Sequence, residues 1–382
     1  MYYITAMQHR RPKQITIEDI LFGEEDPYNA YENETESSST ATVTKSFPTI
    51  SDEIRSKVNV DAIIGWLKRF NESNADLFET NRKDLYTSWM IPKATGGFRQ
   101  IDAPCPKLQN QLQRLAIFLK EDCGVLYHTS AFAYINGRSI VDNVQKHVGS
   151  NWFLKTDFSG FFPSTTLDFT MKMMKIIFPL SEVCRTETGF NELKKALSLG
   201  FLNGGLPQGT CLSPVLTNMI MIPIDHKLFN TLTKRAIVYT RYADDIHISA
   251  REMFPYQKVV AFIEETLKEF EASYVIKPEK THYGNLNGKN WMLGLMLTRD
   301  HKITVGYKKK NYFKASLCSF ILDTQKGKYW SLDDVNHLSG LISYYTMIEK
   351  EYFEGIIEYQ NKKWNVDVRK MLKSYLNGSI GA

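Results

Sequence analysis

Two adjacent carboxylates, Asp244 and Asp245, lie between two runs of alternating β-forming residues in the stretch VYTRYADDIHISA. This alternation predicts a β-hairpin whose turn is formed by Ala243 and Asp244. Two adjacent exposed anions repel each other unless a cation lies between them, so the pair fits a site for a hard divalent metal ion. The alternative is a turn that is acidic without any function, and the pair alone favours that alternative.

A third carboxylate, Asp157, lies at the end of a strand predicted from the run NWFLKTD. Phosphoryl transfer by two metal ions needs carboxylates from separate strands, because no single segment reaches both ions. Asp157 and Asp244 supply such a pair. A glycine-rich loop, GGLPQGTCLSP, places three glycines around Gln208. Glycines let the backbone approach a nucleotide closely, and the Gln208 amide is available for template or sugar contacts.

The elements that must position these residues follow an α+β order. Helical and alternating spacings of apolar residues, bounded by Gly and Pro, separate expected helices from expected strands. We expect helices at residues 56–80, 106–122, 167–178 and 254–273, after the glycine-rich loop, and from about residue 308 to the end. We expect strands within 88–104 (a pair joined by Gly96 and Gly97), at 151–157, in the hairpin, and up to about residue 308. This order predicts a sheet-centred catalytic domain followed by a helical module.

The composition of the 382-residue chain, with 43% hydrophobic residues, is that of a globular protein. The chain has no run of about 18 apolar residues, and its first residues lack the apolar stretch of a signal peptide, so we expect a cytoplasmic protein without membrane contact. The five cysteines are widely spaced and form no C-x-x-C pair. We therefore expect reduced, packed thiols.

The net charge of +5 is unevenly distributed. Between Glu18 and Glu36 there are eight acidic residues and no Lys or Arg, which is typical of a solvated linker. From His301 to Ala382 there are thirteen Lys and Arg against eight Asp and Glu, interleaved with aromatic residues. This C-terminal pattern suits a polyanion with stackable bases, although a solvated helical face over an aromatic core gives the same pattern.

Several motifs occur in an order that resembles the reverse transcriptases. KTDFSGFFPS, GGLPQGTCLSP and YADD resemble the palm motifs of that family, and IPKATGGFRQID is similar to its nucleotide-binding strand pair. IKPEKTH and WMLGLML resemble the motif after the catalytic hairpin and the hairpin at the primer grip. The resemblance runs from about Trp89 to Lys310. It implies an α+β right-hand polymerase fold, with an N-terminal extension at 1–55, fingers at 56–150, a palm with an antiparallel catalytic sheet at 151–300 and a helical thumb at 301–382.

The family pattern implies a role for each matching residue. Asp157 and Asp244 would bind two Mg²⁺ ions, for which Mn²⁺ is a possible substitute, and Asp245 would support them. The implied nucleotide contacts are Lys93 and Arg99 to the triphosphate, Lys280 to the leaving pyrophosphate, Gln208 to template or sugar, and the ring of Phe162 as a steric gate against a 2′-hydroxyl. Without the motifs, surface charge or core packing explains each of these nucleotide contacts.

The segment AFAYINGRSIVDNVQKH resembles retron enzymes, which have an N-A-x-x-H signature where this chain has Asn143 to His147. By spacing alone, Asn143 and His147 are as compatible with packing as with an RNA contact. The residues expected to bind nucleic acid are Arg138, Asn143 and His147 in this segment, and Lys308, Lys309 and Lys310 on the thumb. Where retron enzymes usually have V-T-G, this chain has MLG, so retron and other defence-associated branches both stay open.

The resemblance implies an RNA-directed DNA polymerase with a dedicated noncoding RNA as template, deoxynucleoside triphosphates as substrates and DNA as product. It also implies an anti-phage defence system, often with an effector protein. Two alternatives stay open. One is a polymerase of the same fold that needs no template or synthesises RNA, and the other is a nucleic-acid-binding scaffold for an effector.

Overall fold

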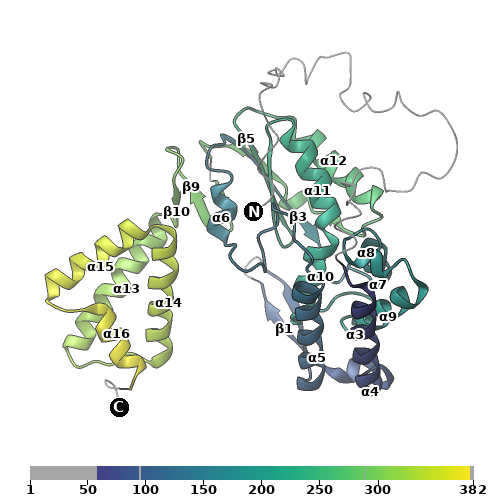
Figure 1. Cartoon of the computed structure of the whole chain (residues 1–382). Helices are drawn as coiled ribbons and strands as arrows, with labels where there is room; N and C mark the ends of the chain where they lie inside the picture. Colours follow the sequence, from purple (N-terminus) through teal and green to yellow (C-terminus); the bar gives the residue numbers. More distant parts are fainter. Residues whose placement is uncertain (1–57, 94–95, 289, 379–382) are drawn as a thin grey trace.

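The computed structural model describes residues 58–93, 96–288 and 290–378. The acidic segment and the N-terminal extension predicted at residues 1–55 lie outside these ranges. Figure 1 shows a main body around a central sheet and, beside it, a bundle of the C-terminal helices. None of the helices in the described ranges is both long and apolar enough to cross a membrane.

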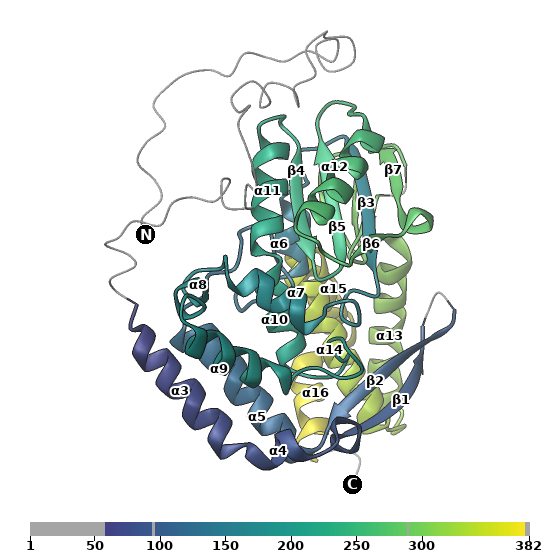
Figure 2. The same cartoon turned by 90° about the vertical axis from the view of Figure 1, so that its right-hand side faces the viewer.

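A five-stranded antiparallel sheet forms the centre of the main body (Figure 2). Its strands are β3 (Trp152–Ser159), β4 (Val238–Tyr242), β5 (Asp245–Ala250), β6 (Val275–Ile276) and β7 (His282–Asn285). The order is β4-β5-β3-β6, and β7 also pairs with β3. β4 and β5 form the predicted hairpin. Because β3 is antiparallel to β5, the C-terminal end of β3 lies beside the hairpin turn.

Helices pack around this sheet, and most of them share one core with it. They are α6 (Ile140–Gln145), α7 (Leu167–Met174), α8 (Leu180–Val183), α9 (Glu187–Ser198), α10 (Leu212–Ile220), α11 (Ile222–Thr233) and α12 (Tyr256–Glu269). Eight of the nine residues of α10 are buried, and most of them are apolar. Each large apolar side chain buried in this way contributes about 1.5–3 kcal/mol.

The N-terminal part of the described chain forms a helical layer and a projecting hairpin. Its elements are α3 (Val60–Ser73), α4 (Ala75–Glu79), the short helix η3 (Arg82–Leu85), β1 (Tyr86–Pro92), β2 (Phe98–Pro104), α5 (Pro106–Ile117) and the π-helical turn η4 (Phe118–Asp122). The strands β1 and β2 pair along their whole length, as predicted, and extend away from the body in Figure 2. Asn71 anchors α3 on α9 by donating to the Glu192 carbonyl at 2.9 Å.

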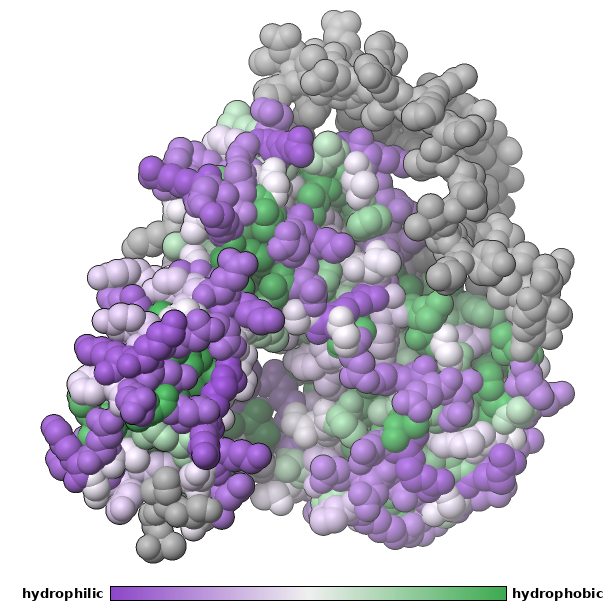
Figure 3. Space-filling view, turned by 60° about the vertical axis from the view of Figure 1, so that its left-hand side comes forward, coloured by the Kyte–Doolittle hydropathy of each residue, from purple (hydrophilic) through white to green (hydrophobic). Residues whose placement is uncertain are grey.

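The C-terminal bundle packs around a second hydrophobic core, to which Val144 of α6 and Phe153 of β3 also contribute. It consists of α13 (Tyr307–Gln325), α14 (Leu332–Ile348), α15 (Lys350–Trp364) and α16 (Val368–Leu376). A small sheet joins the bundle to the main body, and its strands are β8 (Trp291–Met292), β9 (Leu295–Leu297) and β10 (Ile303–Thr304). Along the chain, this sheet comes after the turn η5 (Pro278–Lys280) and β7. Figure 3 shows a deep hollow between the bundle and the main body.

A fully buried ion pair supports the hairpin of β4 and β5. Arg241 in β4 donates from Nε to Asp225 Oδ1 at 2.9 Å and from Nη2 to Asp225 Oδ2 at 2.8 Å, and both side chains have no exposed surface. The Tyr239 hydroxyl donates to the same carboxylate at 2.7 Å. A buried charge is tolerated only when it is paired and hydrogen-bonded in this way, so the pair fixes where β4 lies on α11.

We predict that Arg241→Met lowers the free energy of unfolding by about 3–5 kcal/mol, because the Asp225 carboxylate is then left buried without a partner. Urea unfolding of the purified protein measures this. The matched control is Lys194→Met, which removes the exposed Lys194–Asp168 pair and should cost less than about 1 kcal/mol. Equal costs for the two variants would contradict the supporting role of the buried pair.

Candidate active site

The hairpin turn presents Asp244 at one end of the sheet. Ala243 adopts a positive φ of 58°, and its carbonyl accepts a hydrogen bond from Arg241 Nη1 at 3.0 Å. The backbone of β3 holds the turn from the other side, since the Phe158 N–H donates to the Asp244 carbonyl at 3.2 Å. The turn is therefore fixed to two strands.

Asp157 lies beside this turn, as the sequence predicted. It is directly opposite Asp245 in the β3–β5 pairing and only 5% exposed. Its carbonyl accepts from the Lys277 N–H at 3.1 Å, which brings the segment after β6 to the same point. Three carboxylates from two strands therefore meet at one end of the sheet.

The carboxylates at this end destabilise one another's charged forms. Burial first, and then the negative charges of Asp244 and Asp157, raise the pKa of Asp245 to about 6. Burial and then the charge of Asp157 also raise the pKa of Asp244. Oxygen donors under mutual repulsion are the donor set that a hard divalent cation such as Mg²⁺ or Mn²⁺ stabilises, so these residues fit the implied metal ions.

Two lysines supply positive charge to Asp157. Lys277 Nζ donates to Asp157 Oδ1 at 2.9 Å, and Lys280 Nζ donates to Oδ2. The hydrogen bond to Asp157 is the main reason why the pKa of Lys280 is raised. Within the described part of the chain, no group of three or more His, Cys, Asp or Glu side chains is already arranged around a metal position. Both oxygens of Asp157 accept hydrogen bonds from these ammonium groups.

The glycine-rich loop joins the hairpin of β1 and β2 to the sheet. The carbonyl of Gln208 accepts from the Asp102 N–H at 2.7 Å. Gly209 has a φ of 125°, and a Cβ there would lie 2.8 Å from the Asp102 carbonyl, while one at Gly205 would lie 2.0 Å from the Pro163 carbonyl. These two glycines serve close approach of backbone to backbone, which differs from the approach to a nucleotide that the sequence suggested.

Gln208 and Phe162 lie next to this loop. The Oε1 atom of Gln208 is buried and has no hydrogen-bond partner among the residues that the structure describes. Phe162 is half-buried, and its carbonyl accepts from the Leu206 N–H at 3.1 Å. The loop that holds Gln208 is therefore attached to the turn that follows Asp157. Lys93 and Arg99 lie farther out, exposed at the end of the projecting hairpin.

The expectation that Asn143 and His147 bind RNA is wrong for the described conformation. Both side chains are fully buried, and His147 lies beyond the end of α6. His147 Nδ1 bonds Ser249 Oγ at 2.6 Å and Nε2 bonds Thr240 Oγ1 at 2.8 Å. Burial lowers the pKa of His147 to about 3, so the ring is neutral. The pair instead packs behind the catalytic hairpin, which was the alternative that spacing left open.

Several expected nucleic-acid contacts are engaged within the chain itself. Arg138 donates to the carbonyls of His128 and Ala131, so this guanidinium shapes a loop. Lys309 Nζ donates to the Gly294 carbonyl at 2.8 Å.

Lys310 pairs with Glu349 and lies 4.0 Å from the centre of the Tyr352 ring. Both Lys309 and Lys310 thus contribute to attaching the bundle. Lys308 is exposed.

Sequence reasoning missed three residues at this site. Lys277 lies one 3₁₀ turn before Lys280, and its position in IKPEKTH was the only signal. Asp225 carries no local signal, because it lies sixteen residues from Arg241 inside an apolar helix. Tyr134, in the loop that Arg138 shapes, is 53% exposed and has a positive φ of 60°.

Comparisons with known proteins agree with this geometry. The family model described as reverse transcriptase (RNA-dependent DNA polymerase) matches residues 91–313. The chain is 28% identical over 302 residues to the retron Ec83 reverse transcriptase of Escherichia coli, which covers 77% of this chain and 91% of that protein. It is also 28% identical over 293 residues to the retron Ec73 reverse transcriptase of Escherichia coli, and this alignment covers 72% of this chain and 89% of that protein.

Among solved structures, apo telomerase from Candida tropicalis aligns with a TM-score of 0.44 and 14% identity, over 77% of this chain and 62% of that one. The family model covers more than half of the chain, and it spans the residues that form the carboxylate site. The chain therefore belongs to the reverse transcriptase family, as a retron-like bacterial enzyme that synthesises DNA as an RNA-directed DNA polymerase.

Proposed function

We propose that this enzyme copies a dedicated noncoding RNA into DNA with two Mg²⁺ ions, in the cytoplasm, as part of an anti-phage defence system. The observation that supports it most is the convergence of Asp157, Asp244 and Asp245 at one end of the sheet, with the pKa of the last two raised. A scaffold that only binds nucleic acid gains nothing from buried, mutually repelling anions, because they also repel phosphates. The noncoding RNA template is proposed by analogy with the retron enzymes to which the chain is similar, and an effector protein is a further proposed partner.

In this proposal, Asp157 and Asp244 hold the ions and Asp245 supports them. When bound, the ions activate the primer 3′-hydroxyl and stabilise the charge of the leaving pyrophosphate. Lys280, whose Nζ donates to Asp157 Oδ2, would supply a proton to the leaving pyrophosphate. Lys277 holds the other oxygen of the same carboxylate.

The remaining side chains bind and select the nucleotide. Lys93 and Arg99 bind the triphosphate from the exposed hairpin, where a point charge and a forked donor both suit phosphate oxygens. The buried, unpartnered Oε1 of Gln208 accepts a hydrogen bond from the template or the sugar. The ring of Phe162 lies beneath the sugar and excludes a 2′-hydroxyl. Of the three thumb lysines, exposed Lys308 is the one that binds duplex phosphates.

We predict that Asp244→Asn lowers the rate of DNA synthesis at least about a hundredfold while the protein stays folded, because a metal ligand is lost. The test is to purify both proteins from cells with the native locus, and to sequence the nucleic acid that remains after separate RNase and DNase treatment. DNA complementary to a discrete co-purifying RNA, and absent from the variant, is the expected result. DNA without complementary RNA would instead favour the template-independent polymerase.

We predict that Asp245→Asn stabilises the metal-free protein at about pH 8. The pKa of Asp245 is about 6 in the folded chain and near 3.9 when unfolded, so the folded state binds more protons between these values. The loss of folding stability caused by Asp245 therefore grows as the pH rises and is complete above about pH 6. The expected gain in urea unfolding with EDTA is on the order of 1–3 kcal/mol, falling to about half of that at pH 5. A gain that is independent of pH would contradict charge repulsion as its cause.

We predict that Phe162→Ala raises the use of ribonucleotides relative to deoxynucleotides on the order of 10–100-fold, because the ring no longer fills the space of a 2′-hydroxyl. Single-nucleotide primer extension with each triphosphate gives the ratio. Phe161→Leu is the matched control, since Phe161 is 3% exposed and belongs to the core. An unchanged ratio for Phe162→Ala would reject the gate.

A further inference from the structure

The loop of residues 130–138, in which no role has yet been given to Tyr134, runs beside the hairpin of β4 and β5. Ala131 forms a parallel bridge with Arg241 in β4. The Phe132 N–H donates to the Arg241 carbonyl at 2.9 Å, and the Arg241 N–H donates to the Ser130 carbonyl at 2.8 Å. From this bridge, one chain continues three residues to Tyr134, and β4 continues three residues to the turn residue Asp244.

One buried network holds the two chains together at this point. Arg241 Nη1 donates to the Ala243 carbonyl at 3.0 Å and to Asn218 Oδ1 at 3.2 Å. Asn218 Nδ2 in turn donates to the Ala133 carbonyl at 2.8 Å. The peptide before Tyr134 and the peptide before Asp244 are thus fixed by the same two side chains. These buried hydrogen bonds therefore fix the position of Tyr134 relative to the turn of Asp244.

The backbone conformation and the exposure of Tyr134 are both unfavourable for a residue with only a structural role. Its φ of 60° costs a non-glycine residue free energy, and its ring is 53% exposed, so little burial offsets that cost. Its loop is nevertheless fixed by Arg138, which donates to the carbonyls of His128 and Ala131. A strained, exposed aromatic residue on a rigid support is the expected form of a side chain that contacts a ligand.

The charges around the ring agree with the position that these hydrogen bonds give it. Burial first, and then the carboxylate of Asp244, raise the pKa of Tyr134, whereas the positive charge of Arg99 lowers it. The phenol therefore lies where it senses both a catalytic carboxylate and the hairpin of β1 and β2. Burial, and then Tyr242 at the end of β4, raise the pKa of Tyr344 on α14. This agrees with a helical bundle that borders the same turn.

The strand order shows which side of the catalytic centre Tyr134 faces. β4 is the edge strand of the sheet, and the loop of Tyr134 lies outside it. Phe162 follows β3, on the other side of β5. Tyr134 and Phe162 thus flank the carboxylates from opposite sides. If Phe162 lies beneath the incoming nucleotide, then Tyr134 faces the part of the site that the bundle borders, where the duplex already made must leave.

We propose that the ring of Tyr134 contacts the template–primer duplex at the base pairs next to the catalytic carboxylates. This inference rests on the proposed function. An RNA–DNA hybrid is A-like, and its wide, shallow minor groove presents riboses and 2′-hydroxyls. The flat ring packs against those sugars, and the phenol O–H is a donor for a 2′-oxygen. Neither contact reads sequence, so the effect is the same for every template.

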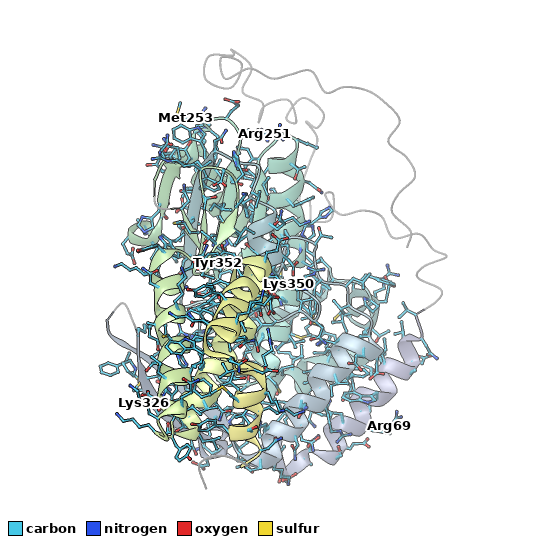
Figure 4. All side chains as sticks on the ribbon, turned by 90° about the vertical axis from the view of Figure 1, so that its left-hand side faces the viewer. Arg69, Arg251, Met253, Lys326, Lys350 and Tyr352 are labelled. Carbon is cyan, nitrogen blue, oxygen red and sulfur yellow. The ribbon has the colours of Figure 1, made fainter. Side chains whose placement is uncertain are left out.

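The experiment measures duplex affinity and nucleotide use separately. The Kd for an RNA–DNA hybrid with a recessed DNA 3′ end is measured by fluorescence anisotropy without nucleotides, and KM and kcat for a deoxynucleotide are measured at saturating hybrid. The variants are Tyr134→Ala and Tyr134→Phe. The matched control is Met253→Ala, because Met253 is 50% exposed beyond the other end of β5 (Figure 4).

We expect Tyr134→Ala to weaken hybrid binding on the order of tenfold, Tyr134→Phe to retain most of the affinity, and Met253→Ala to bind like the wild type. The KM for the deoxynucleotide should change little in all three. Wild-type affinity for Tyr134→Ala would overturn the inference, and so would a raised KM with unchanged Kd, which would place the ring against the nucleotide. A wild-type protein that binds the hybrid but does not extend it would reject the proposed function and leave the binding comparison valid.

Discussion

Repulsion among three carboxylates is the constraint on which one end of the central sheet depends. Asp157, Asp244 and Asp245 are brought together by strand pairing, although burial and like charge raise the pKa of the last two. Such an arrangement loses stability in the metal-free protein, and the rest of the fold must offset the loss. The lysines on Asp157 offset part of it directly, since each supplies an ammonium group to one carboxylate oxygen.

Most of the remaining support is polar and buried, and it is concentrated on β4. Arg241 pairs with Asp225 and also binds the Ala243 carbonyl, while Thr240 on the same strand bonds the neutral ring of His147. These groups are satisfied only when the strand occupies one position on α11 and α6. A purely apolar contact would tolerate a shift of the turn, whereas this network fixes the geometry of the carboxylates.

The residues predicted correctly from sequence are those whose signal is local. The hairpin of Asp244 and the strand of Asp157 were recognisable because alternation and turn chemistry act over a few residues. The burial of Asn143 and His147 was not recognisable from the sequence, because it depends on α6 packing against β4, nearly a hundred residues later. The same limit hid Asp225. The lysines at the start of α13 formed a cationic run in the sequence, yet two of the three have partners that only the folded chain supplies, namely the Gly294 carbonyl between β8 and β9 and the Glu349 carboxylate after α14.

The helical bundle is coupled to β3 through a shared core that includes Phe153, and through a set of polar contacts. Glu349, between α14 and α15, accepts from the Val305 N–H at 2.9 Å and the Thr304 hydroxyl at 2.8 Å, and it pairs with Lys310. The small sheet is in turn held by Lys155, which donates to the Trp291 carbonyl.

Lys155 lies two residues before Asp157, and residues two apart in a strand share a face. The face of β3 that bears Asp157 is therefore also the face on which the connection to the bundle rests.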